Sequence, residues 1–231
     1  MNMQQERGQM SESLLLGGLL AMAGGFFDAY TYLSRGGVFA NAQTGNIVLF
    51  GLKLAEGEWQ RALTYLLPIL AFAFGVVAAE LVKRRGKREK KSNTGLHWRQ
   101  VIVLAEIFLL VIVTFLPQQM NMVVNTVISF VCAMQVETFR KVRGSAFATT
   151  MCTGNLRSGT EQLMIWHHTG EANAARKARH YYSIILFFIL GAALGARLTD
   201  VLGERALLLT CAPLLAVFVL MFRKEEAHIY G

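Results

Sequence analysis

Six long apolar stretches constrain this chain more than any other feature. They are residues 14–33, 62–82, 100–116, 122–139, 180–199 and 206–222. A helix needs about 20 predominantly apolar residues to cross a bilayer. Only 16% of the residues are charged, whereas soluble domains carry about a quarter. The sequence therefore predicts an all-α, polytopic integral membrane protein, a helix bundle with six spans.

Two further stretches, 38–54 and 146–166, are apolar but are each interrupted by a polar cluster. Irregular backbone at membrane depth is tolerated only where it is buried in protein or lines a water-filled cavity. We therefore interpret both stretches as polar, broken or re-entrant segments inside the bundle. Eight full crossings remain the alternative.

The placement of Lys and Arg favours six crossings. With six spans, 18 of the 23 basic residues lie on one side of the membrane, whereas eight spans leave 14 of 23 there. The positive-inside rule then places both termini in the cytoplasm. The basic loop 83–99 would anchor this topology, and its alternative role is attraction to anionic lipid heads. Nucleic acid is not an expected partner, because no stacking aromatic residues alternate with these charges.

An internal repeat divides the chain into two halves, 1–116 and 117–231. Thr-Gly-Asn occurs at 44–46 and again 109 residues later at 153–155, and an acid stands 16 residues before each Thr, at Asp28 and Glu137. Three spans per half would insert the second copy upside down relative to the first. Inverted repeats with interrupted helices at corresponding positions point to a transport site near the bilayer midplane.

The run GGFFDAYTYLSRGGVFANAQTGNIVLFG, residues 24–51, together with the second Thr-Gly-Asn, resembles the YoaK family of bacterial inner-membrane proteins, a domain of unknown function. The resemblance covers essentially the whole chain. It implies a multi-span protein of the bacterial cytoplasmic (inner) membrane, and it supplies no substrate. The motif positions that it carries over are Asp28, Asn41, Thr44, Gly45 and Asn46.

Ionisable residues inside apolar runs are the strongest candidates for function. A carboxylate at the centre of a span is costly, so it normally faces a cavity or a partner. Glu106 interrupts the run VIVLAEIFLLVIVTF and could be a third buried acid or a partner of Arg157. Alternatively, Asp28 and Glu137 each have a structural role, in which the carboxylate pairs with a nearby base or caps a break in the backbone. The Thr-Gly-Asn segments offer hydroxyl, amide and backbone groups, and their alternative is a hydrogen-bonded knot that joins helices.

These observations predict a secondary transporter or channel for a small solute or ion. The predicted path comprises Asp28, Asn41, Thr44, Gly45, Asn46, Glu106, Glu137, Thr153, Gly154 and Asn155. The alternative is a non-transporting membrane scaffold or sensor that binds a partner protein or anionic lipid. A homo-oligomer through small-residue faces such as Gly191–Gly195 is a further possibility.

Enzyme chemistry is not expected from this sequence. No P-loop, zinc-protease, serine-hydrolase or dinucleotide-binding motif occurs in it. His167 and His168 lack an acid or cysteine at a usual ligand spacing, so no metal or other cofactor is predicted. The three cysteines, Cys132, Cys152 and Cys211, lie in apolar or small-residue stretches and are interpreted as free thiols.

Overall fold

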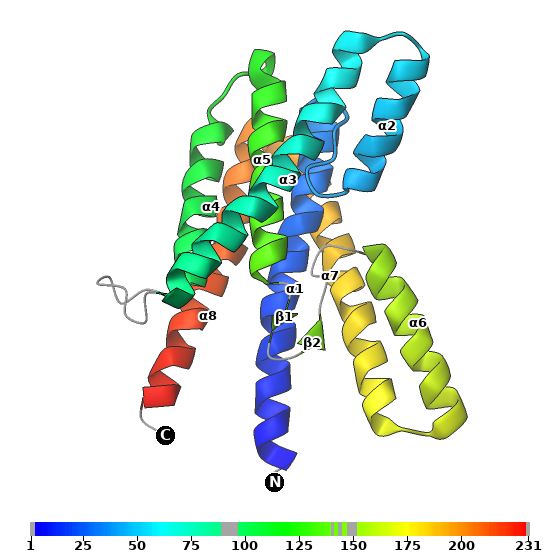
Figure 1. Cartoon of the computed structure of the whole chain (residues 1–231), viewed down its shortest axis with the longest axis vertical. Coiled ribbons are helices and arrows are strands. Elements are labelled where there is room, and N and C mark those ends of the chain that lie inside the picture. The colour runs from blue at the N-terminus through cyan, green and yellow to red at the C-terminus, as the bar shows by residue number, and fades with distance from the viewer. Residues whose placement is uncertain (1–2, 89–96, 140, 143–144, 147–151, 230–231) are drawn as a thin grey trace.

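The computed structural model describes residues 3–88, 97–139, 141–142, 145–146 and 152–229 (Figure 1). A two-residue antiparallel pair, β1 (Lys141–Val142) and β2 (Ser145–Ala146), is the strand content of this part of the chain. The α-helices here are α1 (Met3–Ser34), α2 (Gln43–Ala55), α3 (Trp59–Arg88), α4 (Trp98–Thr114), α5 (Asn121–Thr138), α6 (Cys152–Thr169), α7 (Ala172–Leu202) and α8 (Cys211–Ile229), with short 3-10 helices η1 (Gln118–Met120) and η2 (Gly203–Thr210). The predicted all-α class is confirmed.

Four segments of the described chain are long and apolar enough to cross a membrane. They are Leu14–Ser34, Trp59–Gly86, Gln118–Thr138 and Ala172–Met221, and the last runs through α7, η2 and α8. Helix α4 coincides with a predicted span, but its 17 residues are slightly fewer than the roughly 20 of an ordinary crossing. A membrane protein is therefore supported, whereas the count of six crossings stays a prediction.

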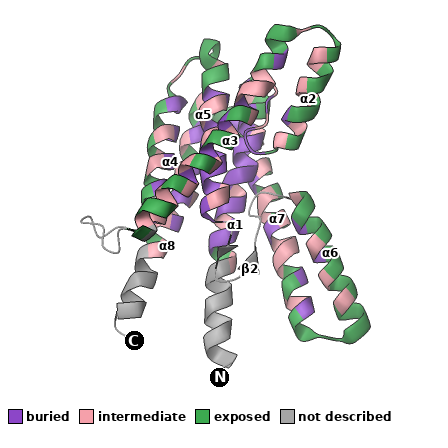
Figure 2. Ribbon diagram, viewed as in Figure 1, coloured by how far each residue is buried: buried purple, intermediate pink, exposed green. Residues whose placement is uncertain are grey.

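The core lies where α1 and α5 meet their partner helices. Helix α1 packs on α7 and α8, α3 packs on α5, and α4 packs on α5 and α8. Buried residues are concentrated along α1 and α5 (Figure 2). Glycine permits the closest of these contacts: a Cβ at Gly191 would collide with the backbone oxygen of Met22, and one at Gly25 with that of Phe188. The Gly191–Gly195 pair therefore serves packing within the chain.

Helices α2 and α6 lie at the edge of the bundle, α2 on α3 and α6 on α7. They run toward opposite ends of the bundle (Figure 1). With 13 residues, α2 rises only about 20 Å, less than the roughly 30 Å of a hydrocarbon core. The sequence suggested that the Thr-Gly-Asn clusters interrupt these segments, but they do not break either helix in the middle. Each cluster forms the first turn of its helix.

A buried arginine fixes the segment between α1 and α2. Arg35 Nε donates to the Tyr30 hydroxyl at 2.9 Å, and its Nη1 donates to Leu116 O and Asn121 Oδ1, both at 3.1 Å. The Arg35 carbonyl oxygen accepts from Asn125 Nδ2 at 2.8 Å. These bonds join the end of α1 to the α4–α5 connection, so the chain that leads into α2 starts from a fixed point.

Candidate functional site

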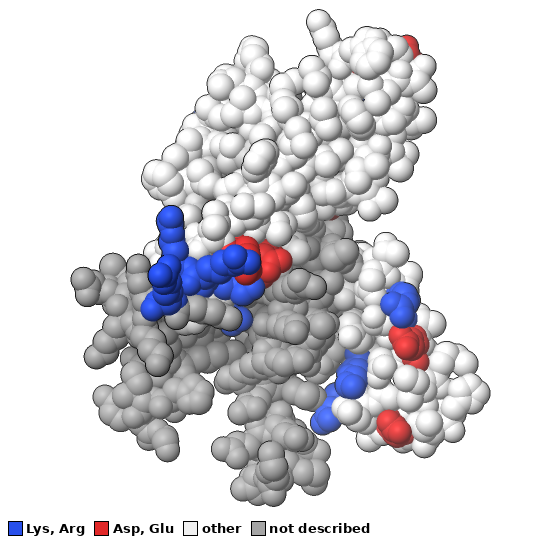
Figure 3. Space-filling view, in the orientation of Figure 1, with Lys and Arg blue, Asp and Glu red and all other residues white. Residues whose placement is uncertain are grey.

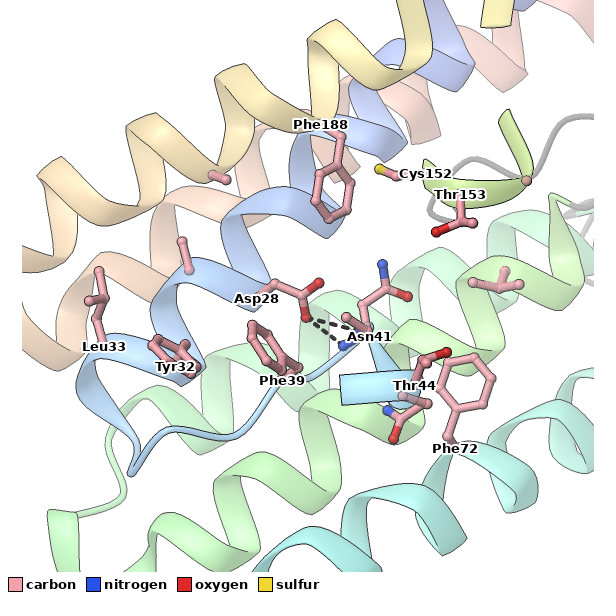
Figure 4. Close-up of a pocket in the computed structure, with 16 residues that line it drawn as sticks. Asp28, Tyr32, Leu33, Phe39, Asn41, Thr44, Phe72, Cys152, Thr153 and Phe188 are labelled. Carbon is pink, nitrogen blue, oxygen red and sulfur yellow. Dashed lines mark hydrogen bonds between the residues drawn. The ribbon is translucent and has the colours of Figure 1, made fainter. Parts of the chain in front are cut away.

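A cavity of about 720 Å³ lies where α2 and α6 begin. Its polar lining comes from both halves of the sequence: Asp28, Asn41, Gln43, Thr44, Thr153 and Gly154 (Figure 4). The two Thr-Gly-Asn clusters, 109 residues apart, therefore border one space. The first turn of a helix exposes backbone N–H groups and carries a partial positive charge, so two such helix starts converge here.

The remaining walls of the cavity are mostly apolar. Phe39 comes from the segment before α2, Phe72 from α3 and Phe188 from α7, and Val136 of α5 completes this side. Ligand sites in proteins have this character, with volumes of about 300–1,000 Å³ and a few placed polar groups in an apolar surround. The cavity thus combines a polar end at the two helix starts with an aromatic body.

Asp28 connects α1 to the start of α2. Its side chain is buried, and Oδ1 accepts from the backbone N–H groups of Asn41 at 2.7 Å and Ala42 at 3.3 Å. Ala42 is the N-cap residue of α2 and has no side chain that could cap the helix. The Asp28 carboxylate takes over that role from another helix, placing a negative charge at the positive end of α2. Its second oxygen points away from these bonds, into the cavity (Figure 4).

The side-chain amide of Asn41 is a hydrogen-bond donor that no other described group of the protein accepts from. Its side chain is only 8% exposed, and its Nδ2 has no hydrogen-bond partner in the described part of the chain. Figure 4 shows this side chain directed toward Cys152 and Thr153. An unpaired buried donor costs about 1–3 kcal/mol. An acceptor group of a molecule bound in the cavity would remove that cost.

Asn46 has a structural task instead. Its Oδ1 accepts from the Phe39 backbone N–H at 3.0 Å, while its Nδ2 donates to the Phe39 carbonyl at 2.6 Å and to Gln43 Oε1 at 3.0 Å. Gly45 makes room for the Phe39 ring, which lies 2.8 Å from the position of a Cβ there. Both residues thus hold the segment 35–42 against α2. Asn155 is likewise buried on α6 and is not part of the cavity lining.

The acids other than Asp28 lie outside the cavity. Glu137 Oε1 is 3.5 Å from Lys83 Nζ, which also donates to Glu80 at 2.7 Å. The interpretation of Glu137 as half of an ion pair therefore fits its place better than a role in the path. Glu106 is fully buried on α4, and neither of its carboxyl oxygens has a partner in the part described. It does not meet Arg157, which pairs with Glu161 at 3.5 Å.

Five of the ten predicted path residues line the cavity: Asp28, Asn41, Thr44, Thr153 and Gly154. The aromatic walls and Cys152 also line the cavity, and neither was among the residues predicted from the sequence. Phe39 stands inside the recognised motif and could have been included. Phe72 and Phe188 lie in spans where aromatic residues are common, so nothing in the sequence distinguished them. Within the residues described, no group of three His, Cys, Asp or Glu side chains could hold a metal ion.

The matched region of the chain contains the whole cavity. A family model named DUF1275, a protein of unknown function, matches residues 16–220. The chain belongs to the DUF1275 family. The UPF0700 transmembrane protein YoaK of Bacillus subtilis (strain 168) is 29% identical over 155 residues, which cover 63% of this chain and 64% of that protein. The resemblance to the YoaK family is thereby confirmed, and the alignment spans just under two thirds of that relative. No solved structure matches the chain.

Proposed function

We propose that this member of the DUF1275 family is a secondary transporter or channel for a small solute or ion, with the cavity as part of its path. One observation carries the proposal: two helix starts from different halves of the sequence border a single cavity that also holds a buried carboxylate. Helix N-termini that lie inside the membrane are a recurring way for transporters to bind the anionic groups of their solutes.

We further infer six crossings, with α2 and α6 re-entering the membrane from opposite sides. The shortness of α2 supports this topology, as does its return toward the end of the bundle where α1 finishes (Figure 1). On the face shown in Figure 3, most charged side chains gather over the end of α3 and over α6 and α7. The same end of the bundle holds the start of α1 and the end of α8. The positive-inside rule makes it the cytoplasmic face of the inner membrane.

Packing supports two inverted halves that meet in the connection between α4 and η1. Helices α1 to α4 correspond, in order, to helices α5 to α8. The packing of α1 on α7 then has its counterpart in that of α5 on α3, and the packing of α2 on α3 has its counterpart in that of α6 on α7. The pair α4–α5 corresponds to α8–α1 in the same way. Glycines follow the same correspondence: Gly75 of α3 abuts the backbone of Phe130, as Gly191 of α7 abuts that of Met22. Two such units that rock about a shared site provide alternating access.

Cys152 allows the transport proposal to be tested before the solute is known. In a Cys132→Ala, Cys211→Ala background, Cys152 is the one remaining thiol. Purified protein in liposomes is screened for exchange of labelled ions, sugars, carboxylates and amino acids. We expect at least one flux above that of empty liposomes, and we expect a small thiol reagent to block it. The matched control is Cys152→Ala in the same background, whose flux should survive the reagent.

Two outcomes would contradict the proposal. One is that no solute class crosses faster than through empty liposomes, which favours the scaffold interpretation. The other is a flux that the reagent blocks equally in the thiol-free control, because the block then does not act at the cavity.

The topology is tested with two cysteines at small exposed positions. Ala55→Cys marks the α2–α3 turn and Ala172→Cys marks the start of α7, both in a background without natural cysteines. With six crossings, an impermeant thiol reagent applied to intact cells labels Ala55→Cys and leaves Ala172→Cys unlabelled until the cells are opened. With eight crossings the two positions lie on the same side. Equal labelling of both would therefore contradict the re-entrant arrangement.

A further inference from the structure

The polar end of the cavity presents an acceptor beside a donor. Asp28 has one oxygen directed into the cavity, and Asn41 has an unpaired amide nitrogen directed into the same space (Figure 4). The two side chains lie close together, because the Asn41 backbone N–H donates to Asp28 Oδ1 at 2.7 Å. A ligand that satisfies both must therefore carry a donor and an acceptor a few ångströms apart.

The charges around this pair limit the ligand further. Asp28 directly offsets the positive end of α2, and the first turn of α6 borders the same space through Cys152, Thr153 and Gly154. Among the described residues that line the cavity, none is Lys or Arg, so multiply charged anions lack a counter-charge. One carboxylate also neutralises only half the charge of a divalent cation, and a buried charge without a counter-charge is costly. A molecule with one positive and one negative group fits the balance.

The body of the cavity selects an apolar substituent. Tyr32, Phe39, Phe72 and Phe188 contribute four aromatic rings from α1, the segment before α2, α3 and α7. Apolar surface buried against such walls contributes about 25 cal/mol per Å². A hydrophilic solute would gain none of this free energy, because it offers the rings no apolar surface to pack against.

We infer that the cavity binds an α-amino acid with an apolar side chain, held as its zwitterion. Its ammonium group donates to the free oxygen of Asp28. Its carboxylate accepts from Asn41 Nδ2 and lies near the start of α6, while its side chain packs among the four rings. This inference rests on the proposed function, since it names the solute class for the same cavity.

The test uses three probes that share one ring. L-Phenylalanine carries both groups, 3-phenylpropanoate lacks the amine, and 2-phenylethylamine lacks the carboxylate. Binding to the purified protein in lipid nanodiscs is measured by competition with labelled L-phenylalanine, and L-leucine is included as a second apolar amino acid. We expect saturable binding of the amino acids and affinities at least about tenfold lower for each incomplete probe, because a hydrogen bond to a charged group is lost.

Variants assign the two ends of the ligand. Asn41→Leu removes the unpaired donor without breaking an internal bond of that nitrogen, so it is expected to fold and to bind L-phenylalanine about tenfold more weakly. Asp28→Asn removes the negative charge, and Asp28→Glu is expected to restore part of the binding. Asp200→Asn makes the same chemical change at an exposed position outside the cavity and should leave the affinity unaltered.

Three results would overturn the inference. They are no saturable binding of either amino acid, equal affinity for the three aromatic probes, and an affinity in Asn41→Leu equal to that of the wild type. Uptake of the bound amino acid into liposomes separates this inference from the proposed function. Binding without uptake supports the site and contradicts transport. A flux of another solute that is blocked at Cys152, without amino acid binding, supports transport and contradicts the site.

Discussion

Replacing Arg35 by Met tests whether the segment between α1 and α2 is held as the structure indicates. The Arg35 side chain is fully buried and donates three hydrogen bonds, to Tyr30, Leu116 and Asn121. Met has a similar length but donates none. The three acceptors would therefore lose a charged partner inside the protein, where water replaces it poorly.

The size of the effect follows from those contacts. Each buried acceptor left without its partner costs about 1–3 kcal/mol, so the three lost bonds together lower the free energy of unfolding by at least about 3 kcal/mol. The Arg35–Glu204 pair adds little, because its atoms are 3.7 Å apart and the Glu204 side chain is 32% exposed, so solvent screens it. For a chain of this length 1 kcal/mol corresponds to roughly 2–4 °C in Tm, so we expect a decrease of about 10 °C.

The assay is thermal unfolding of purified protein in detergent, and it needs no substrate. Arg61→Met is the matched control: its side chain is 71% exposed and pairs with Glu58, three residues away, so its loss should cost less than about 1 kcal/mol. Arg35→Lys keeps the charge but cannot reach three acceptors, and we expect an intermediate Tm. If Arg35→Met lowers Tm no more than Arg61→Met does, the buried network does not stabilise the protein.

Three other predictions use the same preparations. Gly191→Ala and Gly75→Ala should each lower the unfolding free energy by about 1–3 kcal/mol, because the added Cβ meets facing backbone. Gly51→Ala has open space around it inside α2, so in the same thermal assay it should leave the unfolding free energy unchanged or raise it by up to about 1 kcal/mol. Asn46→Ala should cost about 2 kcal/mol through its lost bonds to Phe39, and equal stability of Asn46→Ala and the exposed Asn173→Ala would contradict the structural role of Asn46. Glu137→Gln should preserve the flux that a Cys152 reagent blocks, whereas Asp28→Asn should reduce that flux. An equal loss of flux in both variants would indicate that Glu137 takes part in transport.

The helices could be predicted because their information is local. Five of the six apolar runs each lie mainly in one α-helix, and the sixth, 206–222, is divided between η2 and α8. A run of about 20 such residues has few other stable states in a bilayer. The position of the polar break could not be predicted in the same way. Whether Thr-Gly-Asn interrupts a helix or begins one depends on what caps the backbone before it. For α2 that group is Asp28, which belongs to another helix.

The candidate site was predictable in part for a related reason. Equal spacing in the sequence paired Asp28 with Glu137, but spacing along one chain does not reveal which side chain of another helix stands opposite. Lys83 stands opposite Glu137, and no base lines the cavity beside Asp28 in the described residues. Arg35 shows the same limit. An arginine near the end of a span is ordinarily expected at the membrane surface, whereas acceptors from separate elements make the burial of Arg35 possible.

The different fates of the two acids explain how a repeated architecture can produce an asymmetric site. Under the proposed inverted arrangement, α2 and α6 deliver equivalent helix starts to the cavity, and two equivalent acids would leave it uniformly charged. Asp28 accepts hydrogen bonds at the start of α2, whereas Glu137 lies 3.5 Å from Lys83 and outside the cavity lining. The polar end of the cavity therefore holds a single buried carboxylate beside the unpaired Asn41 donor. An acceptor and a donor held side by side orient a solute that carries two unlike polar groups, and the second acid, Glu137, pairs with Lys83 outside the cavity.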